Sequence, residues 1–374
     1  MRIKDIEAFH VSIPLNSPYI FARGSMEAFE NVVVRIITDN GLTGYGESAP
    51  LPLGKGDNAA SISSKINETL SRSFKGFSVY DIEYIISHAM EITGENADVV
   101  AGIDLALWDL LGKGLKQPVY RLIGGLCQDN ISVDYTLSAS SPSEMAEKAK
   151  KIYLKGFKGM IVKTIGNSVQ EDIKRVRSVR EAIPKHCRVS IDCNACYNRD
   201  EALQFLNGIK DFKVGYVEQP VAGEDLEGMR TCREVGIPIA ADESLVTSKD
   251  ALTLIREKAC DIMNIKVTKA GGLFMSKRIA SISSAAGIPV ICGGRTTFDI
   301  SRYASRHFAA STYGCRNLSH VGAGPASQAL IDDIVEDRTT IEKVNKGGGA
   351  LKVEQGPGLG FKINWDKVEK YLVC

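Results

Sequence analysis

The stretch that decides the fold begins with GMIVK (159–163) and continues through VSID (189–192), GYVE (215–218), IPIAAD (237–242) and DIMNIK (261–266). Each segment is a short apolar run that ends on a charged residue, and these end residues lie 29, 26, 24 and 24 positions apart. A strand, a loop, a crossover helix and a return loop take about 25 to 30 residues. The spacing therefore predicts successive parallel strands whose last residues meet at one mouth.

Further strand-like and helical segments extend this alternation. The additional strand candidates are ISVDYT from 131, IPVICG from 288 and NLSHV from 317, and the helical patterns between strands include 144–156, 172–183 and 273–287. Alternating strands and helices indicate a parallel sheet with crossover helices. Eight strands favour closure into a barrel, although periodicity alone is also compatible with an open doubly wound sheet.

The region before the barrel has a different character. Residues 2–13 and 31–38 are rich in β-branched side chains, and Asp39-Asn40-Gly41 predicts a turn into a third strand at 42–47. Residues 58–115 have helical periodicity. These patterns predict a small antiparallel sheet covered by helices.

The chain length requires more than one domain. A single barrel uses about 200 to 250 residues, and this chain has 374. We expect an α+β capping domain at 1–125, completed by a C-terminal tail at 346–374, and a (β/α)7β barrel at 126–345.

Composition excludes several classes of partner. The chain carries 46 Lys+Arg against 45 Asp+Glu, a formal net charge of +1, without a concentrated basic patch, so we expect no nucleic acid partner. No run reaches the roughly 18 to 20 apolar residues of a membrane span, and charges interrupt the N-terminal MRIKDIEAFHV, where a signal peptide is apolar. We therefore expect a cytoplasmic protein that acts on a small molecule.

The nine cysteines fit reduced thiols better than a disulfide framework. Cys193 and Cys196 form a CxxC, but no second CxxC or histidine pair completes a zinc site. We interpret both as small residues that fill space beside a metal ligand.

Charged residues end five successive predicted strands. Asp192, Glu218 and Asp242 end three adjacent strands and form an all-oxygen set suited to Mg²⁺, with Mn²⁺ as a substitute. Lys163 and Lys266 end the flanking strands and approach from opposite sides. We expect one lysine to remove the α-proton of a carboxylate substrate and the other to return it, while the metal stabilises the enediolate. To act as a base, a lysine needs a pKa lowered by burial and by the nearby cation.

Other interpretations of these residues remain open. A lysine after a strand is often a solvated charge, and an acidic residue there often caps the next helix. A metal-free aldolase that forms a Schiff base through Lys163 or Lys266 needs the same lysines. A non-catalytic protein on the same scaffold is a further alternative, because a fold does not specify a function.

Several strings resemble the enolase superfamily, in its mandelate racemase/muconate lactonizing enzyme subgroup, and are most similar to the L-Ala-D/L-Glu (dipeptide) epimerases. The resemblance covers nearly the whole chain. The strings are 32–50 (VVVRIITDNGLTGYGESAP), 106–125 (ALWDLLGKGLKQPVYRLIGG), 133–145 (VDYTLSASSPSEM), 191–194 (IDCN), 217–220 (VEQP), 241–244 (ADES), 264–273 (NIKVTKAGGL) and 356–360 (GPGLG).

The resemblance implies a capping domain built from both chain ends, a modified (β/α)7β barrel and symmetric homo-oligomers. It also implies Mg²⁺ held by Asp192, Glu218 and Asp242, with Lys163 and Lys266 as the acid/base pair. The family positions of Asn194 and Glu243 support the metal and the second lysine. The implied activity is racemisation or epimerisation, and β-elimination or muconate-type cycloisomerisation through the same enediolate is the alternative.

Two departures from the family pattern concern base strength and specificity. The family's KxK on the second strand reads IVK here, with Ile161 at the first lysine position, so a neighbouring charge that would lower the pKa of Lys163 is absent. The family's DxD after the eighth strand, which holds a dipeptide ammonium group, is replaced by Gly322-Ala323-Gly324. Without that acidic pair a buried ammonium group would lack a partner, so dipeptides are doubtful substrates.

Other side chains are expected near the mouth. They are Tyr135 and Thr136 on the first barrel strand, Arg295 after the seventh, His320 on the eighth, and Arg23 from a loop at 16–28 that would act as a lid. The two arginines would suit a second acidic group on the substrate.

Overall fold

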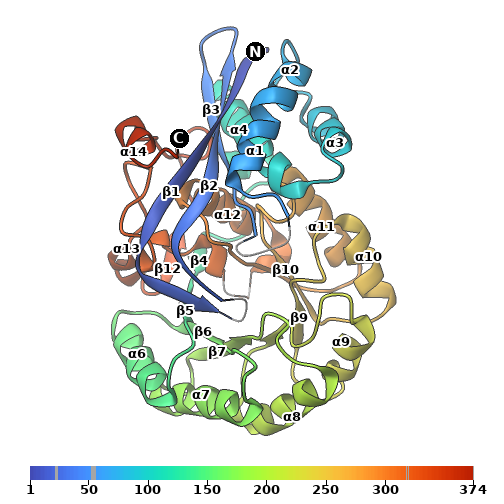
Figure 1. The fold of residues 1–374 in the computed structure, drawn as a ribbon, viewed down its shortest axis with the longest axis vertical. Helices are drawn as coiled ribbons and strands as arrows, with labels where there is room; N and C mark the ends of the chain where they lie inside the picture. The colour runs from blue at the N-terminus through green and yellow to red at the C-terminus, as the bar shows by residue number, and fades with distance from the viewer. Residues whose placement is uncertain (22–23, 52–55, 317, 319, 374) are drawn as a thin grey trace.

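The computed structural model describes residues 1–373 except 22–23, 52–55, 317 and 319. An antiparallel sheet with its own helices lies at one end of the molecule, and parallel strands surrounded by helices lie at the other (Figure 1). Within the described ranges no helix is both long enough and apolar enough to cross a membrane.

The strands are β1 (Ile3–Phe21), β2 (Gly24–Thr38), β3 (Thr43–Ser48), β4 (Asn130–Ser132), β5 (Asp134–Leu137), β6 (Gly159–Lys163), β7 (Arg188–Asp192), β8 (Val217–Glu218), β9 (Ile239–Ala241), β10 (Ile262–Ile265), β11 (Val290–Cys292) and β12 (Ala350–Lys352). The α-helices are α1 (Ala59–Lys65), α2 (Ser71–Phe74), α3 (Ile82–Ile92), α4 (Ala97–Gly114), α5 (Val119–Leu122), α6 (Pro142–Leu154), α7 (Val169–Ala182), α8 (Arg199–Ile209), α9 (Leu226–Arg233), α10 (Ser248–Arg256), α11 (Leu273–Ala285), α12 (Asp299–Ala310), α13 (Ile341–Lys346) and α14 (Trp365–Lys370). The shorter helical turns are η1 (Ile66–Leu70), η2 (Lys210–Phe212), η3 (Tyr313–Cys315), η4 (Val321–Ala323) and η5 (Ala326–Gln328).

Strands β1 to β3 form an antiparallel sheet that, with α1 to α4, makes up the unit we call the cap. Helix α4 begins at Asn96, whose side chain accepts a hydrogen bond from Val99 N at 3.2 Å. Its apolar face, which includes Val99 and Ile103, shares a buried core with Val32 and Val34 of β2. The predicted antiparallel sheet with covering helices is confirmed.

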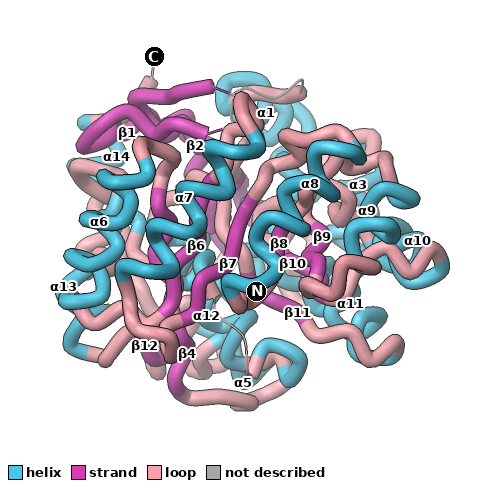
Figure 2. Tube along the Cα trace, turned by 90° about the horizontal axis from the view of Figure 1, so that it is seen from below, coloured by secondary structure: helices cyan, strands magenta, loops and turns pink. Residues whose placement is uncertain are grey.

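Strands β5 to β11 form one parallel sheet in chain order, with α6 to α10 on its outer side (Figure 2). With α6 to α12 these strands make up the unit we call the barrel. Lys163 pairs with Asp192 and Asp192 with Glu218, while β9 and β10 end beside them in the same register. The predicted alignment of the strand ends at one mouth is therefore confirmed.

The segment predicted as an eighth strand differs from the expectation. Residues 317 and 319 lie outside the described part of the chain, and the described residues 318 and 320 are not in a strand. The turn η4 contacts both edge strands, β5 and β11, and so lies where an eighth strand was expected. A Cβ on Gly322 would lie 2.0 Å from the Gly293 carbonyl oxygen, so glycine is needed for this close approach.

The predicted lid loop at 16–28 is wrong for its described residues, which belong largely to a hairpin. Strand β1 runs on to Phe21, and Tyr19 pairs with Met26 after an irregularity that begins at Pro14. The aromatic and β-branched run Tyr19-Ile20-Phe21 favours a strand and overrides the preceding Asn, Ser and Pro turn signals. Arg23 lies outside the described residues. The hairpin reaches from the cap toward the barrel (Figure 1).

The C-terminal tail contacts the cap. The ring centroid of Trp365 in α14 lies 5.3 Å from that of Phe9 and 5.8 Å from that of Tyr45. Val373 N donates to His10 O at 2.9 Å. The domain boundaries at 125, 126, 345 and 346 stay predictions.

Candidate active site

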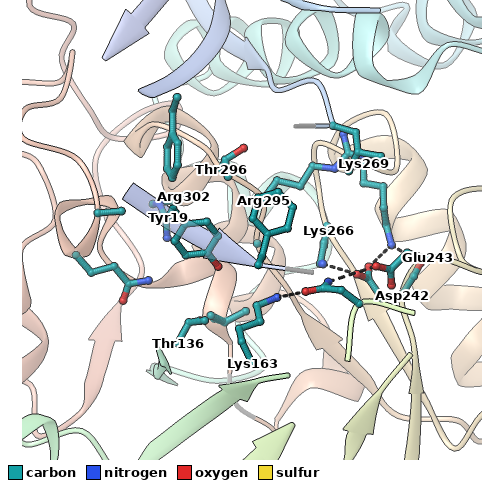
Figure 3. A pocket seen from close by; sticks show the side chains of 18 of the residues that line it. Tyr19, Thr136, Lys163, Asp242, Glu243, Lys266, Lys269, Arg295, Thr296 and Arg302 are labelled. Atoms are coloured by element: carbon teal, nitrogen blue, oxygen red, sulfur yellow. Dashed lines mark hydrogen bonds and ion pairs between the residues drawn. The ribbon is translucent and has the colours of Figure 1, made fainter. Parts of the chain in front are cut away.

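A cavity of about 210 Å³ opens at the carboxyl ends of the barrel strands, where the cap hairpin covers them (Figure 3). Side chains from both units line it, so the barrel supplies the charged floor and the cap supplies part of the wall. The lining residues are Tyr19, Phe21, Phe29, Leu51, Thr136, Lys163, Asn194, Asp242, Glu243, Val246, Lys266, Lys269, Gly294, Arg295, Thr296, Arg302, Val321, Gln328 and Ala329.

Lys163 is the last residue of β6, and its ammonium group is almost fully buried. It donates to the carboxylate of Asp192 and, at 2.7 Å, to Asn194 Oδ1. Burial has the largest single effect and lowers the pKa of Lys163, but nearby negative charges, Asp192 first among them, together raise it by more, so the pKa lies above its ordinary value. Lys163 is therefore held in its protonated, proton-donating form.

Lys266 follows β10 directly and approaches from the other side. Its Nζ lies 2.5 Å from Asp242 Oδ2 and 3.5 Å from Glu218 Oε1. Burial lowers the pKa of Lys266, and the carboxylates of Asp242 and Glu218 raise it above its ordinary value. The positive charge of Lys266 lowers the pKa of Lys163, but by less than the Asp192 carboxylate raises it.

Lys269 is a site residue that sequence reasoning missed. Its ammonium group donates to the main-chain oxygen of Asp242 at 2.6 Å and to the Asp242 carboxylate, and it is buried. The feature of the sequence that could have identified it is its position three residues after Lys266, in the same loop after the strand. Figure 3 shows Lys266 and Lys269 directed at Asp242 from the same loop.

The three carboxylates have the chemistry of a site for a hard cation. Burial raises the pKa of Glu218 well above its ordinary value, and the negative charges of Asp192 and Asp242 raise it further. That mutual repulsion is what a divalent cation would relieve, so the donor set fits Mg²⁺. Within the described residues no three Asp, Glu, His or Cys side chains already surround one point; these carboxylates hold lysine ammonium groups. A cation would therefore have to displace those groups.

Polar side chains behind the carboxylates fix their positions. Asn194, at φ 45°, donates through its main-chain N to Asp192 Oδ1 at 2.9 Å and through Nδ2 to Glu243 Oε1 at 3.3 Å. Burial first, and then the Asp242 charge, raises the pKa of Glu243 to about 7. The left-handed backbone at Asn194 costs about 1 kcal/mol or more, which these hydrogen bonds offset.

Gln219 is a second residue that sequence reasoning missed. It follows β8 with φ 38°, and its Oε1 accepts hydrogen bonds from Asp242 N at 2.9 Å and from Ser244 Oγ at 2.8 Å. One buried amide thus ties the loop after β8 to the loop after β9. It lies within the VEQP string, but the string does not reveal which loop its side chain binds.

The predicted substrate contacts separate into two groups. Thr136 and Arg295 line the cavity, although Arg295 donates to Asp98 and, at 2.9 Å, to Ala49 O of the cap. Tyr135 faces the helix layer instead, because neighbouring residues on a strand point to opposite sides, and its ring packs on Phe157.

The placement of His320 corrects a second expectation. The side chain is fully buried and is not among the residues that line the cavity. Its Nε2 lies 3.2 Å from Gln128 Nε2, and burial lowers the pKa of His320 to about 4. His320 is therefore a neutral interior residue rather than a ligand at the mouth.

The CxxC residues behave as interior fillers. Cys193 and Cys196 are both free thiols, and burial raises the pKa of Cys196 to about 12. A thiol with a raised pKa is a poor nucleophile and a poor metal ligand.

Comparison with known proteins agrees with this geometry. Residues 3–124 match the family model of the mandelate racemase/muconate lactonizing enzyme N-terminal domain, and residues 144–367 match that of the enolase C-terminal domain-like family. An L-Ala-D/L-Glu epimerase of Clostridium acetobutylicum is 36% identical over 314 residues, 83% of this chain and 87% of the relative.

Two solved structures are similar over nearly all of both chains. The N-succinyl Arg/Lys racemase of Bacillus cereus has a TM-score of 0.93 at 28% identity, covering 100% of this chain and 99% of that one. A dipeptide epimerase of Enterococcus faecalis, in complex with Mg and L-Leu-L-Tyr, has a TM-score of 0.90 at 29% identity, covering 97% and 100%.

Proposed function

Because this chain belongs to the mandelate racemase/muconate lactonizing enzyme family of the enolase superfamily, we propose that it is an Mg²⁺-dependent racemase or epimerase of a carboxylate substrate, an amino-acid derivative. The observation that carries the proposal is the placement of the two lysines. Lys163 and Lys266 line one cavity and bind acidic residues that end the strands between them. A substrate bound there would have one ammonium group on each face of its α-carbon.

The proposed roles follow from the contacts. The lysine on one face removes the α-proton in its neutral form, and the lysine on the other face, protonated, donates one and so inverts the centre. Asp192, Glu218 and Asp242 would hold Mg²⁺, which supplies positive charge to the substrate carboxylate and competes with the lysines for these anions. Ile161 shares a strand face with Lys163 and adds no charge there.

The residues of the cavity wall indicate which substrate groups would be attached to the α-carbon. The wall includes Tyr19, Phe21, Phe29 and Leu51, which offer apolar surface. Thr136 and Gln328 add neutral polar groups. We propose a neutral amide and an apolar side chain on the substrate, which these groups would accommodate.

The described arginines at the cavity already have partners, and Arg23, which was expected to join Arg295 in binding a second acidic group, lies outside the described residues. Of the described residues that line the cavity, Arg295 and Arg302 carry guanidinium groups. Arg295 binds Asp98 and Ala49 O, and Arg302 donates to Gly324 O at 2.8 Å. A second substrate carboxylate would have to compete with these partners.

A test of the function is α-proton exchange in D₂O, followed by NMR, over carboxylates of both configurations. We expect deuterium to enter the α-position of a good substrate, Lys163→Ala and Lys266→Ala each to abolish exchange from one configuration, and Lys249→Ala on the exposed surface of α10 to have no effect. Absence of exchange from every carboxylate tested would refute the proposal.

Metal removal separates this function from a Schiff-base aldolase. We expect EDTA to abolish exchange and Mg²⁺ to restore it, because the three carboxylates need a cation to stabilise the developing charge. Exchange that persists in EDTA, together with borohydride trapping on a lysine, would favour the aldolase.

The second candidate function uses the same first step. In β-elimination or cycloisomerisation one lysine acts as base and the other as a fixed charge. Retained turnover in one of the two Lys→Ala variants would favour this candidate. Use of Mn²⁺, a cytoplasmic location and a homo-oligomeric state stay predictions from the sequence and its resemblance.

Matched substrates test the proposed side-chain preference. N-acetyl-leucine, N-succinyl-leucine and alanyl-leucine share an α-carbon but differ in one distal charge. We expect fastest exchange with the acetyl compound, and fastest exchange with the dipeptide would show that an ammonium group is accommodated after all.

A further inference from the structure

Two helices of the barrel lack an N-cap side chain of their own. Five other barrel helices begin at a residue whose side chain accepts a main-chain N–H of the first turn; these are Ser141 of α6, Ser168 of α7, Asn198 of α8, Asp225 of α9 and Thr247 of α10. Helices α11 and α12 begin at Gly272 and Phe298, which form no such bond. A first turn without acceptors leaves N–H groups unsatisfied.

Asp104 of the cap supplies the acceptors for α11. Its carboxylate, fully buried on α4, accepts hydrogen bonds from Leu273 N and, at 3.2 Å, from Phe274 N. Gly272 has φ 103°, and a Cβ there would lie 2.2 Å from Asp104 Oδ1. The glycine that cannot cap its own helix is thus the residue that lets the carboxylate of the cap approach.

Alongside Asp333, whose Oδ2 accepts from Asp299 N at 3.1 Å, Glu47 of the cap supplies two acceptors for α12. Its Oε1 accepts from Phe298 N at 2.7 Å and its Oε2 from Ser301 N at 2.9 Å. Asn31 of β2 bridges the two units, because its Nδ2 donates to Glu47 Oε1 at 2.9 Å and to Thr296 O at 2.8 Å. The side chains of Glu47 and Asn31 are both buried.

Both capped helices follow loops that line the cavity. The loop before α11 carries Lys266 and Lys269, and it is tightly wound: Ala270 N donates to Lys266 O and Gly272 N to Val267 O, both at 2.9 Å. The start of α11 is therefore linked to the main chain of Lys266 by consecutive turns. The loop before α12 carries Arg295 and Thr296, which also line the cavity.

We propose that Asp104 and Glu47 are positioning residues, which place Lys266 and the Arg295–Thr296 loop by capping α11 and α12 from the other structural unit. The part concerning Lys266 rests on the proposed function. Helix α7, which follows Lys163, is capped within its own loop by Ser168. The cap thereby positions the loop of Lys266, whereas the loop after Lys163 is capped within the barrel, and loss of the Asp104 carboxylate has an unequal effect on the two lysines.

The first experiment compares the two substrate configurations. We assign to Lys266 the substrate configuration from which α-proton exchange is abolished in Lys266→Ala. We expect Asp104→Asn, which keeps the shape but turns one acceptor into a donor, to slow exchange from that configuration about tenfold to a hundredfold and to change exchange from the other less than about twofold. Equal slowing of both configurations would indicate a purely structural role and overturn the proposal.

A matched control lies on the same helix. Asp109 of α4 is also a buried carboxylate that accepts main-chain N–H groups, from Leu359 and Tyr45, both at 3.0 Å, but neither belongs to a loop that lines the cavity. We expect Asp109→Asn to leave the ratio of the two exchange rates unchanged. The same skewed ratio in Asp109→Asn would contradict the proposal.

The second experiment does not depend on activity. Amide hydrogen exchange followed by mass spectrometry should show faster exchange in peptides covering 266–276 for Asp104→Asn and in peptides covering 294–301 for Glu47→Gln, with neither change in Asp109→Asn. Unchanged protection in both variants would overturn the proposal even if the enzyme proved to have another activity. If the wild-type protein catalyses no α-proton exchange but the variants show these changes in amide protection, the capping role is supported and the proposed function is refuted.

Glu47→Gln also has its own kinetic signature. The loop that Glu47 holds, with Arg295 and Thr296, carries cavity-lining residues but neither acid/base lysine. We therefore expect KM to rise about tenfold while kcat changes less than about twofold. A fall in kcat at constant KM would contradict the assigned role of this loop.

Discussion

Single residues around the cavity are paired as buried ions. Lys163 binds Asp192, Lys266 binds Asp242 and Glu218, and Lys269 binds Asp242. Removing one partner of a buried ion pair leaves an uncompensated charge, at a cost of about 3 to 5 kcal/mol. The lysines and carboxylates of the site therefore form one network of ion pairs. Replacing any one of them changes the electrostatic environment of its partners.

Lys269 holds Asp242 through two contacts, and its replacement tests the effect of losing them. Lys269→Met removes the donor to the main-chain oxygen of Asp242 and one of its two ammonium partners. We expect α-proton exchange to slow at least about tenfold, because Asp242 loses its fixed position. Steady-state exchange rates measure this. Lys249→Met is the control, since Lys249 is exposed and pairs with Glu95; equal effects in both variants would contradict the role of Lys269.

At the scale of elements, two pieces outside the regular strands and helices of the barrel complete the cavity. The turn η4 lies against both edge strands, and the extended hairpin of β1 and β2 brings Tyr19 and Phe21 to the mouth. Neither was expected from the local sequence, because Gly322-Ala323-Gly324 and the segment from Asn16 to Pro18 have turn-like composition.

The fit of η4 can be tested by adding one methyl group. In Gly322→Ala the Cβ would lie 2.0 Å from Gly293 O, so the turn must move away from β11. We expect the free energy of unfolding in urea to fall by about 1 to 3 kcal/mol. Gly56→Ala is the control, since no atom of the described residues lies within 4 Å of a Cβ there, and it should change stability little.

The hairpin alternates between an inner and an outer face. Tyr19 lines the cavity, whereas Ile20 is 47% exposed. We expect Tyr19→Ala to raise KM about tenfold, because it removes apolar wall from the binding site, and Ile20→Ala to leave KM unchanged. Substrate titrations of both variants measure this, and a similar KM for the two would show that the hairpin does not contact substrate.

At the scale of the whole molecule, the cap and the barrel meet through buried carboxylates. Burial raises the pKa of Asp104 from 3.8, and that of Glu47 from 4.5, to about 7 in each case. A carboxyl group in such a place costs free energy when it ionises, although its oxygens serve as helix caps. The stability of the contact between the cap and the barrel therefore depends on pH near neutrality.

This sensitivity has a definite sign for Asp104. Its folded pKa lies above the unfolded value, so its contribution to stability is fully present below about pH 4 and is lost as pH rises through about 7. We expect the free energy of unfolding of wild type, relative to Asp104→Asn, to fall between pH 5 and 8 at up to about 1.4 kcal/mol per pH unit. Urea titrations at several pH values measure it, and a flat difference would contradict a raised pKa.

The sequence determined the elements whose signal is local and periodic. The spacing from Lys163 to Lys266 was enough to align five strand ends, because a crossover unit has a nearly fixed length. The same spacing brought the two lysines and three carboxylates to one mouth, and the resemblance identified the family. Thr136 and Arg295, which were expected near the mouth, line the cavity, and their contact with substrate stays a prediction.

Only the tertiary structure decided the contacts between distant segments. That Tyr135 faces outward follows from the strand register, and the burial of His320 follows from the turn that replaces a strand. Asp104 and Leu273 are 169 residues apart, and Glu47 and Phe298 are 251 apart. Hydrogen bonds of this range leave no periodicity in the chain, since they depend on how two separately folded units pack, and so the carboxylates that hold the lysine loop in place could be found only in three dimensions.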